Sequence, residues 1–186
     1  EAVGPQVKNF QVGDRATSDS ATWCGECDNC KKGWHSLCEK CAYLGLSRDG
    51  AYAEYVNVPV ASVYKLPDNV SFEWGAMVEP FACALHVIHQ SRLKIGETIV
   101  VVGTGPIGLM CAHYAKIAGA NKVFVIARTA IKKEVAENLG AIVLDPATDD
   151  IVSIIKSETG GLGADIALEV VGTEETIDLS LNVVKT

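Results

Sequence analysis

The sequence lacks the features that would place the protein in a membrane or on a nucleic acid. No apolar run approaches the roughly twenty residues needed to cross a bilayer, and no polybasic block, low-complexity segment or secretory signal is evident. Lysine and arginine number 16 against 23 aspartates and glutamates, a net charge of −7. Because nonspecific nucleic-acid affinity depends mainly on cationic side chains, we expect neither a membrane nor a nucleic acid as a partner.

Apolar residues, in contrast, are plentiful enough for a packed core. They make up 48% of the 186 residues, as in a soluble globular chain of one domain or two small ones. With no secretory signal, a cytoplasmic location is the default expectation, and cysteine thiols stay reduced there.

Four cysteines stand close together in a short polar stretch, residues 23–41, that has too few large apolar residues to fold by burial alone. Cys24, Cys27, Cys30 and Cys38 follow the pattern C-x2-C-x2-C-x7-C. Thiolates at this spacing can converge on one tetrahedral Zn²⁺, and four sulfurs leave no open position for water or substrate. The pattern therefore predicts a structural zinc site, and residues 23–41 are called the zinc lobe below.

Disulfides and free thiols are the alternatives, but three cysteines within seven residues do not pair comfortably. Cys41 lies three residues after Cys38 and could compete as the fourth ligand, although we expect it to be a bystander. Cys83 and Cys111 fall within apolar helical patterns, which predicts buried thiols that pack as small hydrophobic groups.

The hydrophobic period changes near residue 71 and divides the chain into a β-rich part and an α/β part. Before this point, short strand-like runs cover residues 10–12, 51–58 and 62–66, and turns separate them. From Ser71, a suitable helix N-cap, the period becomes helical, breaks at Glu79–Pro80 and then resumes.

After Gly96 the sequence alternates four strands with helices. The strands are nearly continuous apolar runs, as a parallel sheet covered on both faces requires. They cover Thr98–Val102, Lys122–Ala127, Ala141–Leu144 and Ala164–Val170.

A G-x-G-x-x-G motif directly follows the first of these strands. Gly103 permits a tight turn, Gly105 lets a pyrophosphate approach the backbone, and Gly108 lets helix and sheet pack closely. Pro106 and Ile107 begin a helix whose free N–H groups and positive dipole end would face the phosphates. The motif predicts a dinucleotide site; a tight turn without a ligand is the alternative.

Taken together, these segments resemble the zinc-containing medium-chain alcohol dehydrogenases, most closely the polyol branch with the sorbitol and butanediol dehydrogenases. The matching segments extend over essentially the whole chain: Val12–Arg15, Cys24–Cys38, Gly50–Tyr55, Lys65–Pro67, Val78–Pro80, Ala84–His86, Gly103–Gly108, Leu139–Ala141, Gly163–Asp165 and Val171–Gly172.

The resemblance implies an α/β fold in two parts. Residues 1–85 would form part of a β-rich GroES-like catalytic domain with the zinc lobe, and residues 86–186 part of a Rossmann dinucleotide-binding domain with a doubly wound parallel sheet. Members of the family are about twice this length, and their catalytic zinc is held by a cysteine and a histidine–glutamate pair that would precede residue 1. We therefore expect an internal fragment whose sheet continues beyond residue 186, leaving the edge of the fourth strand open.

The resemblance also implies an enzyme that transfers hydride between a secondary alcohol or polyol and a nicotinamide cofactor, with a catalytic as well as a structural zinc. It places a zinc ligand or a nearby acid at Glu79, although Glu79 could also merely cap the helix that starts at Pro80. His86 is expected to be a packing residue and His35 to lie on the surface of the zinc lobe. Threonine dehydrogenases or other NAD-using relatives are near alternatives, and a non-catalytic zinc-stabilised binding module is an alternative of another class. For the whole enzyme we expect a homodimer or homotetramer.

The end of the second strand favours NADP over NAD. NAD-binding sheets usually place an acidic residue about twenty residues beyond the glycine motif, and Ala127 occupies that place. Arg128 offers a planar fork that can bind a 2′-phosphate, and Lys132 and Lys133 could add positive charge. The alternative is a solvated helix start with no role in cofactor choice.

Overall fold

The computed structural model describes residues 1–185 and separates into two compact units, Glu1–Glu79 and Pro80–Thr186. The boundary predicted after residue 85 falls within a helix beyond this division, and it stays a prediction for the domains of the whole protein. No helix among the described residues is both long and apolar enough to cross a membrane.

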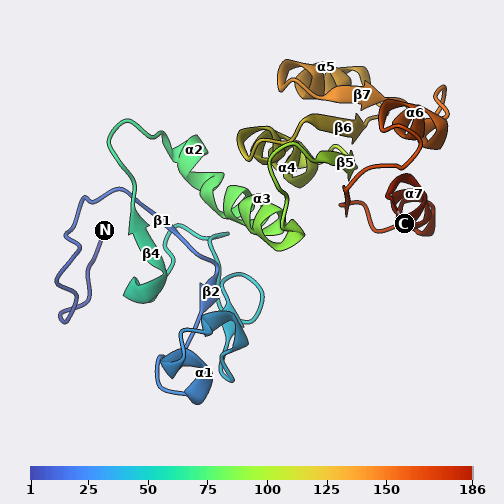
Figure 1. Ribbon diagram of the computed structural model, residues 1–186. Helices are drawn as coiled ribbons and strands as arrows, with labels where there is room; N and C mark the ends of the chain where they lie inside the picture. The colour runs from blue at the N-terminus through green and yellow to red at the C-terminus, as the bar shows by residue number, and fades with distance from the viewer. Residues whose placement is uncertain (186) are drawn as a thin grey trace. The chain divides into compact units, whose positions relative to one another are not determined.

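The first unit contains two small antiparallel sheets (Figure 1). In one, β1 (Ala16–Ser18) pairs with β4 (Val63–Lys65), which follows a 3-10 turn at Val60–Ser62. In the other, β2 (Ala21–Thr22) pairs with β3 (Ala42–Tyr43). The zinc lobe is the excursion between these two strands, and it contains α1 (Asp28–Lys31) and a 3-10 turn at His35–Leu37.

The strands predicted at residues 10–12 and 51–58 are absent from the structure. Residues 51–58 are irregular, and Tyr52 and Tyr55 are largely exposed. Their alternating sequence suits a strand, but an extended segment becomes a strand only when a neighbour accepts and donates its backbone hydrogen bonds. No neighbouring strand within residues 1–185 does so for this segment.

Two helices follow β4. Ser71 caps α2 (Phe72–Ala76) as predicted, because its side chain accepts a hydrogen bond from the Trp74 N–H at 3.2 Å. The break expected at Glu79–Pro80 instead lies at Met77, and α3 (Val78–Ser91) runs through the proline. Proline is tolerated here because the N–H groups of a helix's first turn have no partner within the helix.

The second unit is built on a parallel sheet of four strands in the order β7-β6-β5-β8. The strands are β5 (Thr98–Val102), β6 (Lys122–Ile126), β7 (Ile142–Leu144) and β8 (Ile166–Glu169), each within two residues of its predicted start. Every residue of β5 is buried, in agreement with its continuous apolar sequence.

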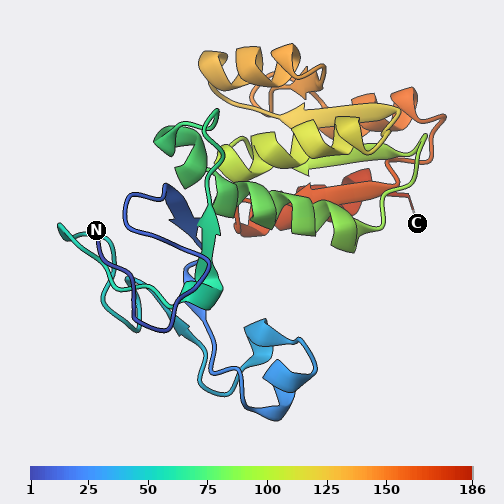
Figure 2. The same ribbon diagram turned by 90° about the vertical axis from the view of Figure 1, so that its left-hand side faces the viewer.

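Helices cover both faces of this sheet (Figure 2). On one face, α4 (Pro106–Ile117) contacts β5 and β6 while α5 (Ala130–Asn138) contacts β7. On the other face, α6 (Ile151–Glu158) and α7 (Glu174–Val183) pack against alternate residues of the strands. The core on that side consists of Val100, Val102, Phe124, Ile126, Leu144, Ile151, Ile155, Ala164 and Val183.

β8 forms one edge of the sheet, since among the described residues its only partner strand is β5. The expected open edge is covered only just before β8 begins. There Ala164 forms a parallel bridge with Val184, the residue after α7. The Ala164 N–H donates to the Val183 carbonyl at 2.8 Å, and the Lys185 N–H donates to the Ala164 carbonyl at 2.9 Å. The rest of the edge offers unpaired backbone groups to a further strand.

Candidate functional site

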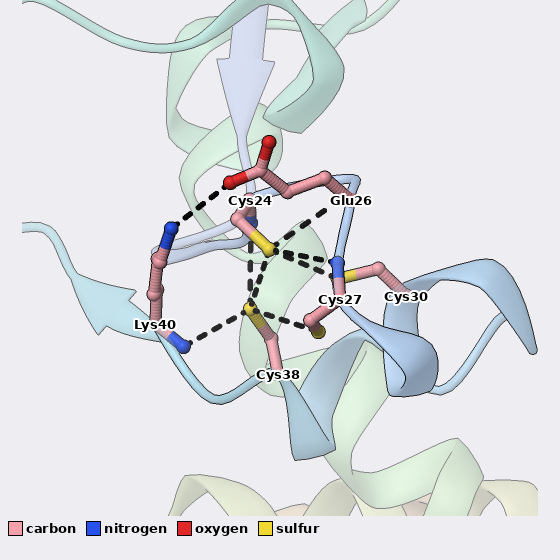
Figure 3. A network of polar contacts seen from close by, with 6 residues as sticks. All are labelled: Cys24, Glu26, Cys27, Cys30, Cys38 and Lys40. Carbon is pink, nitrogen blue, oxygen red and sulfur yellow. Dashed lines mark hydrogen bonds and ion pairs between the residues drawn. The ribbon is translucent and has the colours of Figure 1, made fainter.

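The four clustered cysteines bring their sulfur atoms together in the zinc lobe (Figure 3). The Sγ atom of Cys24 lies 3.9 Å from that of Cys30 and 3.6 Å from that of Cys38, and Cys27 Sγ lies 4.0 Å from Cys38 Sγ. Four sulfurs placed 2.3 Å from one ion form a tetrahedron with edges of about 3.8 Å. The sulfur geometry therefore fits one tetrahedral metal ion with all four positions filled by protein.

Backbone N–H groups point at the sulfurs and favour their ionised form. Cys24 Sγ accepts from the N–H groups of Glu26 and Cys27 at 3.5 and 3.4 Å, and these bonds lower the pKa of the Cys24 thiol. The N–H groups of Cys30 and Glu39 lower the pKa of Cys27 to about 6. Burial raises the pKa of Cys30 to about 12, so this thiol ionises readily only when a cation binds beside it.

Contacts around the cluster hold the lobe in shape. The rings of Trp23 and His35 stack at 4.4 Å, and His35 is exposed on the lobe as predicted. The Cys38 Sγ atom accepts from the Lys40 N–H at 3.3 Å, and the Lys40 ammonium pairs with Glu26 at 2.9 Å (Figure 3). That ion pair is exposed and contributes little to stability.

The other three cysteines lie outside the cluster. Cys41 does not join the group of four sulfurs, as expected. Cys111 is buried, which raises the pKa of its thiol to about 11, and its Sγ approaches the Ala84 carbonyl at 3.9 Å. The prediction of a buried Cys83 is wrong: the buried stripe of α3 runs through Ala84 and Ile88, which places Cys83 on an exposed part of the helix.

The glycine motif forms the expected turn between β5 and α4. Gly103 has φ 117°, and Gly105 caps α4 with open space where its side chain would be. A Cβ at Gly108 would lie 2.1 Å from the Gly103 carbonyl oxygen and 3.0 Å from a Val170 methyl carbon. Gly108 is therefore required mainly by the turn itself and secondarily by packing against the end of β8.

A crevice of about 520 Å³ opens at the carboxyl ends of the strands. In the sheet, β5 lies between β6, the next strand along the chain, and β8. The strand order therefore reverses beside β5, and the crevice lies at this topological switch point, where open α/β sheets bind ligands. Its lining residues come from the ends of the four strands, the loops that follow them, and α5 and α7: Val102, Gly103, Thr104, Gly105, Ile126, Arg128, Thr129, Lys132, Pro146, Val170, Val171, Glu175, Thr176 and Leu179.

The basic residues after β6 separate into two groups. Arg128 and Lys132 are exposed and line the crevice, and within residues 1–185 their side chains make no hydrogen bond or ion pair. Lys133, which was expected to add charge, instead pairs with Asp145 at 2.5 Å and lowers the pKa of that carboxyl. Ala127 is fully buried at the end of β6, and its N–H donates to the Leu144 carbonyl at 3.0 Å.

Glu79 lies in the first turn of α3 and lines a separate groove of about 420 Å³ in the first unit. The groove walls are mostly apolar and include Val56, Leu66 and Phe72. Within the described residues, no group of metal-ligating side chains includes Glu79. His86 is exposed on α3, so its expected packing role is wrong.

The contribution of β8 and α7 to the crevice was not predicted from the sequence. Val170 and Val171 follow β8, and Glu175, Thr176 and Leu179 lie on α7. Nothing local marks these residues, although the rule that ligands bind at the carboxyl ends of parallel strands would have selected the residues after β8.

Family comparison agrees with this geometry. The profile described as zinc-binding dehydrogenase matches residues 106–186, and the profile described as alcohol dehydrogenase GroES-like domain matches residues 1–68. The chain belongs to the zinc-binding alcohol dehydrogenase family. The predicted family and α/β fold class are thereby confirmed.

Individual relatives extend the comparison. The (R,R)-butanediol dehydrogenase of Bacillus subtilis is 41% identical over 172 residues, covering 91% of this chain and 48% of the relative. The L-threonine 3-dehydrogenase of Caldanaerobacter subterraneus subsp. tengcongensis is 37% identical over 176 residues, covering 94% and 50%. A zinc-binding dehydrogenase target from Sinorhizobium meliloti 1021, solved bound to NADP, superposes with a TM-score of 0.91 at 35% identity, covering 99% of this chain and 55% of that chain. The chain spans about half the length of the curated relatives it matches.

Proposed function

We propose that this chain supplies the dinucleotide crevice and the structural zinc lobe of a dehydrogenase that transfers hydride between a small secondary alcohol or polyol and NADP. The observation that carries the proposal is the crevice at the switch point, where the glycine turn and two unpaired cationic side chains meet. Bound NADP would accept or supply the hydride. The chain's own task is to bind and orient the dinucleotide, with the phosphates facing the N-terminus of α4.

The preference for NADP rests on the residues that follow β6. Ala127 leaves no carboxylate to repel a 2′-phosphate, while Arg128 and Lys132 line the crevice with their charges uncompensated. A charge-assisted hydrogen bond contributes about 1.5–3 kcal/mol, so one such bond shifts cofactor preference by about ten- to 150-fold. The NADP-bound relative from Sinorhizobium meliloti is consistent with this choice.

A double substitution tests the cofactor assignment. Ala127→Asp with Arg128→Leu should reverse the ratio of NADPH to NADH affinity, measured by fluorescence titration, and in the active enzyme the ratio of kcat/KM. Lys156→Leu is the control, because it removes an equal charge from exposed α6, outside the crevice. A wild-type protein that prefers NADH would refute the assignment.

We propose that one Zn²⁺ binds Cys24, Cys27, Cys30 and Cys38. The sulfur spacing supports this assignment, as does the lowered pKa of Cys24 and Cys27. With four protein ligands the ion would stabilise the lobe and take no part in the reaction.

Glu79 is proposed as a ligand of the catalytic zinc or as an acid beside it. Its position on a groove of the first unit supports a role toward a ligand. The other ligands would come from outside the described residues, since no further metal-ligating group joins Glu79 there.

The similarity to an L-threonine 3-dehydrogenase supports a second candidate substrate, a β-hydroxy amino acid such as threonine. NAD is the alternative cofactor in this proposal. Comparing turnover of a polyol, a vicinal diol and threonine would distinguish these substrate classes. A homodimer or homotetramer in the cytoplasm remains part of the proposal.

A further inference from the structure

Glu169, the last residue of β8, closes the turn that follows this strand. Its Oε1 atom accepts from the N–H groups of Val171 at 2.8 Å and Gly172 at 2.9 Å, and Oε2 accepts from Gly172 at 3.1 Å. Within residues 1–185, these two N–H groups donate to Glu169 alone. The hydrogen bond from Gly172 is the main reason that the pKa of Glu169 lies below its usual value, so the carboxylate is ionised at neutral pH.

The turn held by Glu169 forms one wall of the crevice. Val170 and Val171 both line it, and Val171 is 52% exposed although it is apolar. A Cβ at Gly103 would lie 2.6 Å from a methyl carbon of Val171, so this side chain rests directly on the glycine turn. Gly172 has φ 89°, a conformation that glycine adopts at little cost, and α7 begins two residues later.

The crevice therefore has two chemically different ends. Arg128 and Lys132 give the end at β6 its positive charge, and the glycine turn after β5 lies at the centre. The end at β8 carries no positive charge among the described residues: Val170 and Val171 line it, together with Glu175, Thr176 and Leu179 of α7. A dinucleotide with its adenosine phosphate at the β6 end and its pyrophosphate at the glycine turn must continue toward the β8 end.

We propose that Glu169 is a positioning residue for the nicotinamide half of the cofactor: it fixes the turn that presents Val171 to the β8 end of the crevice. Glu169 acts through the backbone of this turn and does not itself line the crevice. The inference rests on the proposed function, because it presumes that a nicotinamide dinucleotide binds in this crevice.

Two substitutions separate the acceptor atoms of Glu169 from its charge. Glu169→Ala removes both acceptors, whereas Glu169→Gln keeps one oxygen in the place of Oε1, the atom that binds both N–H groups. Glu174→Ala is the control, since it removes a nearby exposed carboxylate that does not line the crevice. Each protein is titrated with the dinucleotide that the wild type binds more tightly, NADPH or NADH, and with the matching half-ligand, adenosine 2′,5′-bisphosphate or AMP.

Glu169→Ala should weaken binding of the dinucleotide by about ten- to a hundredfold, because the turn is then ordered only part of the time. Glu169→Gln should restore most of that loss, and Glu174→Ala should bind like the wild type. The half-ligand should bind equally to all four proteins, which a general loss of folding would not allow. Hydrogen exchange should become faster at the Val171 and Gly172 amides of Glu169→Ala while β5 stays protected.

The outcomes separate the two claims. Wild-type protein that binds neither dinucleotide overturns the proposed function and this inference with it. If the wild type binds a dinucleotide and Glu169→Ala binds it with the same affinity, the inference alone is overturned. Equal losses for the dinucleotide and the half-ligand also overturn it, because they would assign Glu169 a general structural role.

Discussion

Replacing one of the four clustered cysteines should release the metal and unfold the zinc lobe while sparing the parallel sheet. Within residues 23–41 only Cys30 and Cys38 are buried, and both belong to the cluster, so the lobe has no apolar core to hold it without the ion. Structural zinc contributes about 10–16 kcal/mol of apparent binding free energy in small zinc domains. One of four thiolates then accounts for about 2.5–4 kcal/mol, or two to three orders of magnitude in zinc affinity.

The assay is zinc retention at a chelator concentration that leaves the wild type loaded. Cys27→Ser should lose most of its zinc and show fast amide exchange across the lobe, with unchanged protection in β5 and α4. Cys41→Ser is the matched control, because Cys41 lies in the same lobe but outside the sulfur group. Full zinc retention by Cys27→Ser would refute the assignment, and equal loss from Cys41→Ser would show that the fourth ligand had been chosen wrongly.

Four further predictions concern the second unit. Gly108→Ala should destabilise the protein by more than about 2 kcal/mol in urea unfolding, because its Cβ would lie 2.1 Å from the Gly103 carbonyl. Gly105→Ala should stay within about 1 kcal/mol of the wild type, since no atom lies within 4 Å of its Cβ, yet bind the dinucleotide more weakly because the Cβ occupies the approach to the backbone. Asp165→Asn should cost about 0.2–1 kcal/mol at pH 7, because the carboxylate loses its ion pair with the half-exposed Lys185, which lowers the pKa of Asp165, while the amide oxygen can still accept from the Thr98 N–H. A lowered pKa stabilises the folded state above the pKa of the unfolded chain, about 3.9, and this stability is lost as the pH falls through the folded-state pKa, so the difference between the two proteins should shrink as the solution is made more acidic than about pH 3.9. Finally, the open edge of β8 should make the isolated chain associate, and a monodisperse, cooperatively melting monomer in light scattering and calorimetry would contradict that.

The features predicted correctly from the sequence are those that local chemistry specifies. Three of the four clustered cysteines fall within seven residues, so the convergence of their sulfur atoms depends on one short loop. The strands of the parallel sheet are continuous apolar runs bounded by turns, and their positions follow from composition alone. The glycine turn needs only a backbone that can adopt φ 117° at Gly103 and an absent side chain at Gly108.

The failures depend on partners that are distant in the sequence. Residues 51–58 have the alternation of a strand, but no neighbour among the described residues pairs with them. The helix break moved from Glu79–Pro80 to Met77 because proline is harmless in a first turn, and that distinction depends on where the helix starts. Cys83 was assigned to the wrong face for a similar reason, since a shift of one residue turns a side chain by about 100° around a helix.

The cofactor crevice depends on both kinds of information. Lys132 and Lys133 are adjacent and chemically identical, and the sequence gives each the same expected role. The structure separates them, because Lys133 is neutralised by Asp145 from the loop after β7 while Lys132 faces the crevice. Among the described residues, Arg128 and Lys132 therefore supply the positive charge that lines the crevice. As far as the structure describes it, the opposite wall has no basic side chain; it includes Glu175, and its form depends on the backbone turn that Glu169 closes. Charge at one end and turn geometry at the other would thus control separate parts of the same ligand, so substitutions at the two ends should affect different halves of the cofactor.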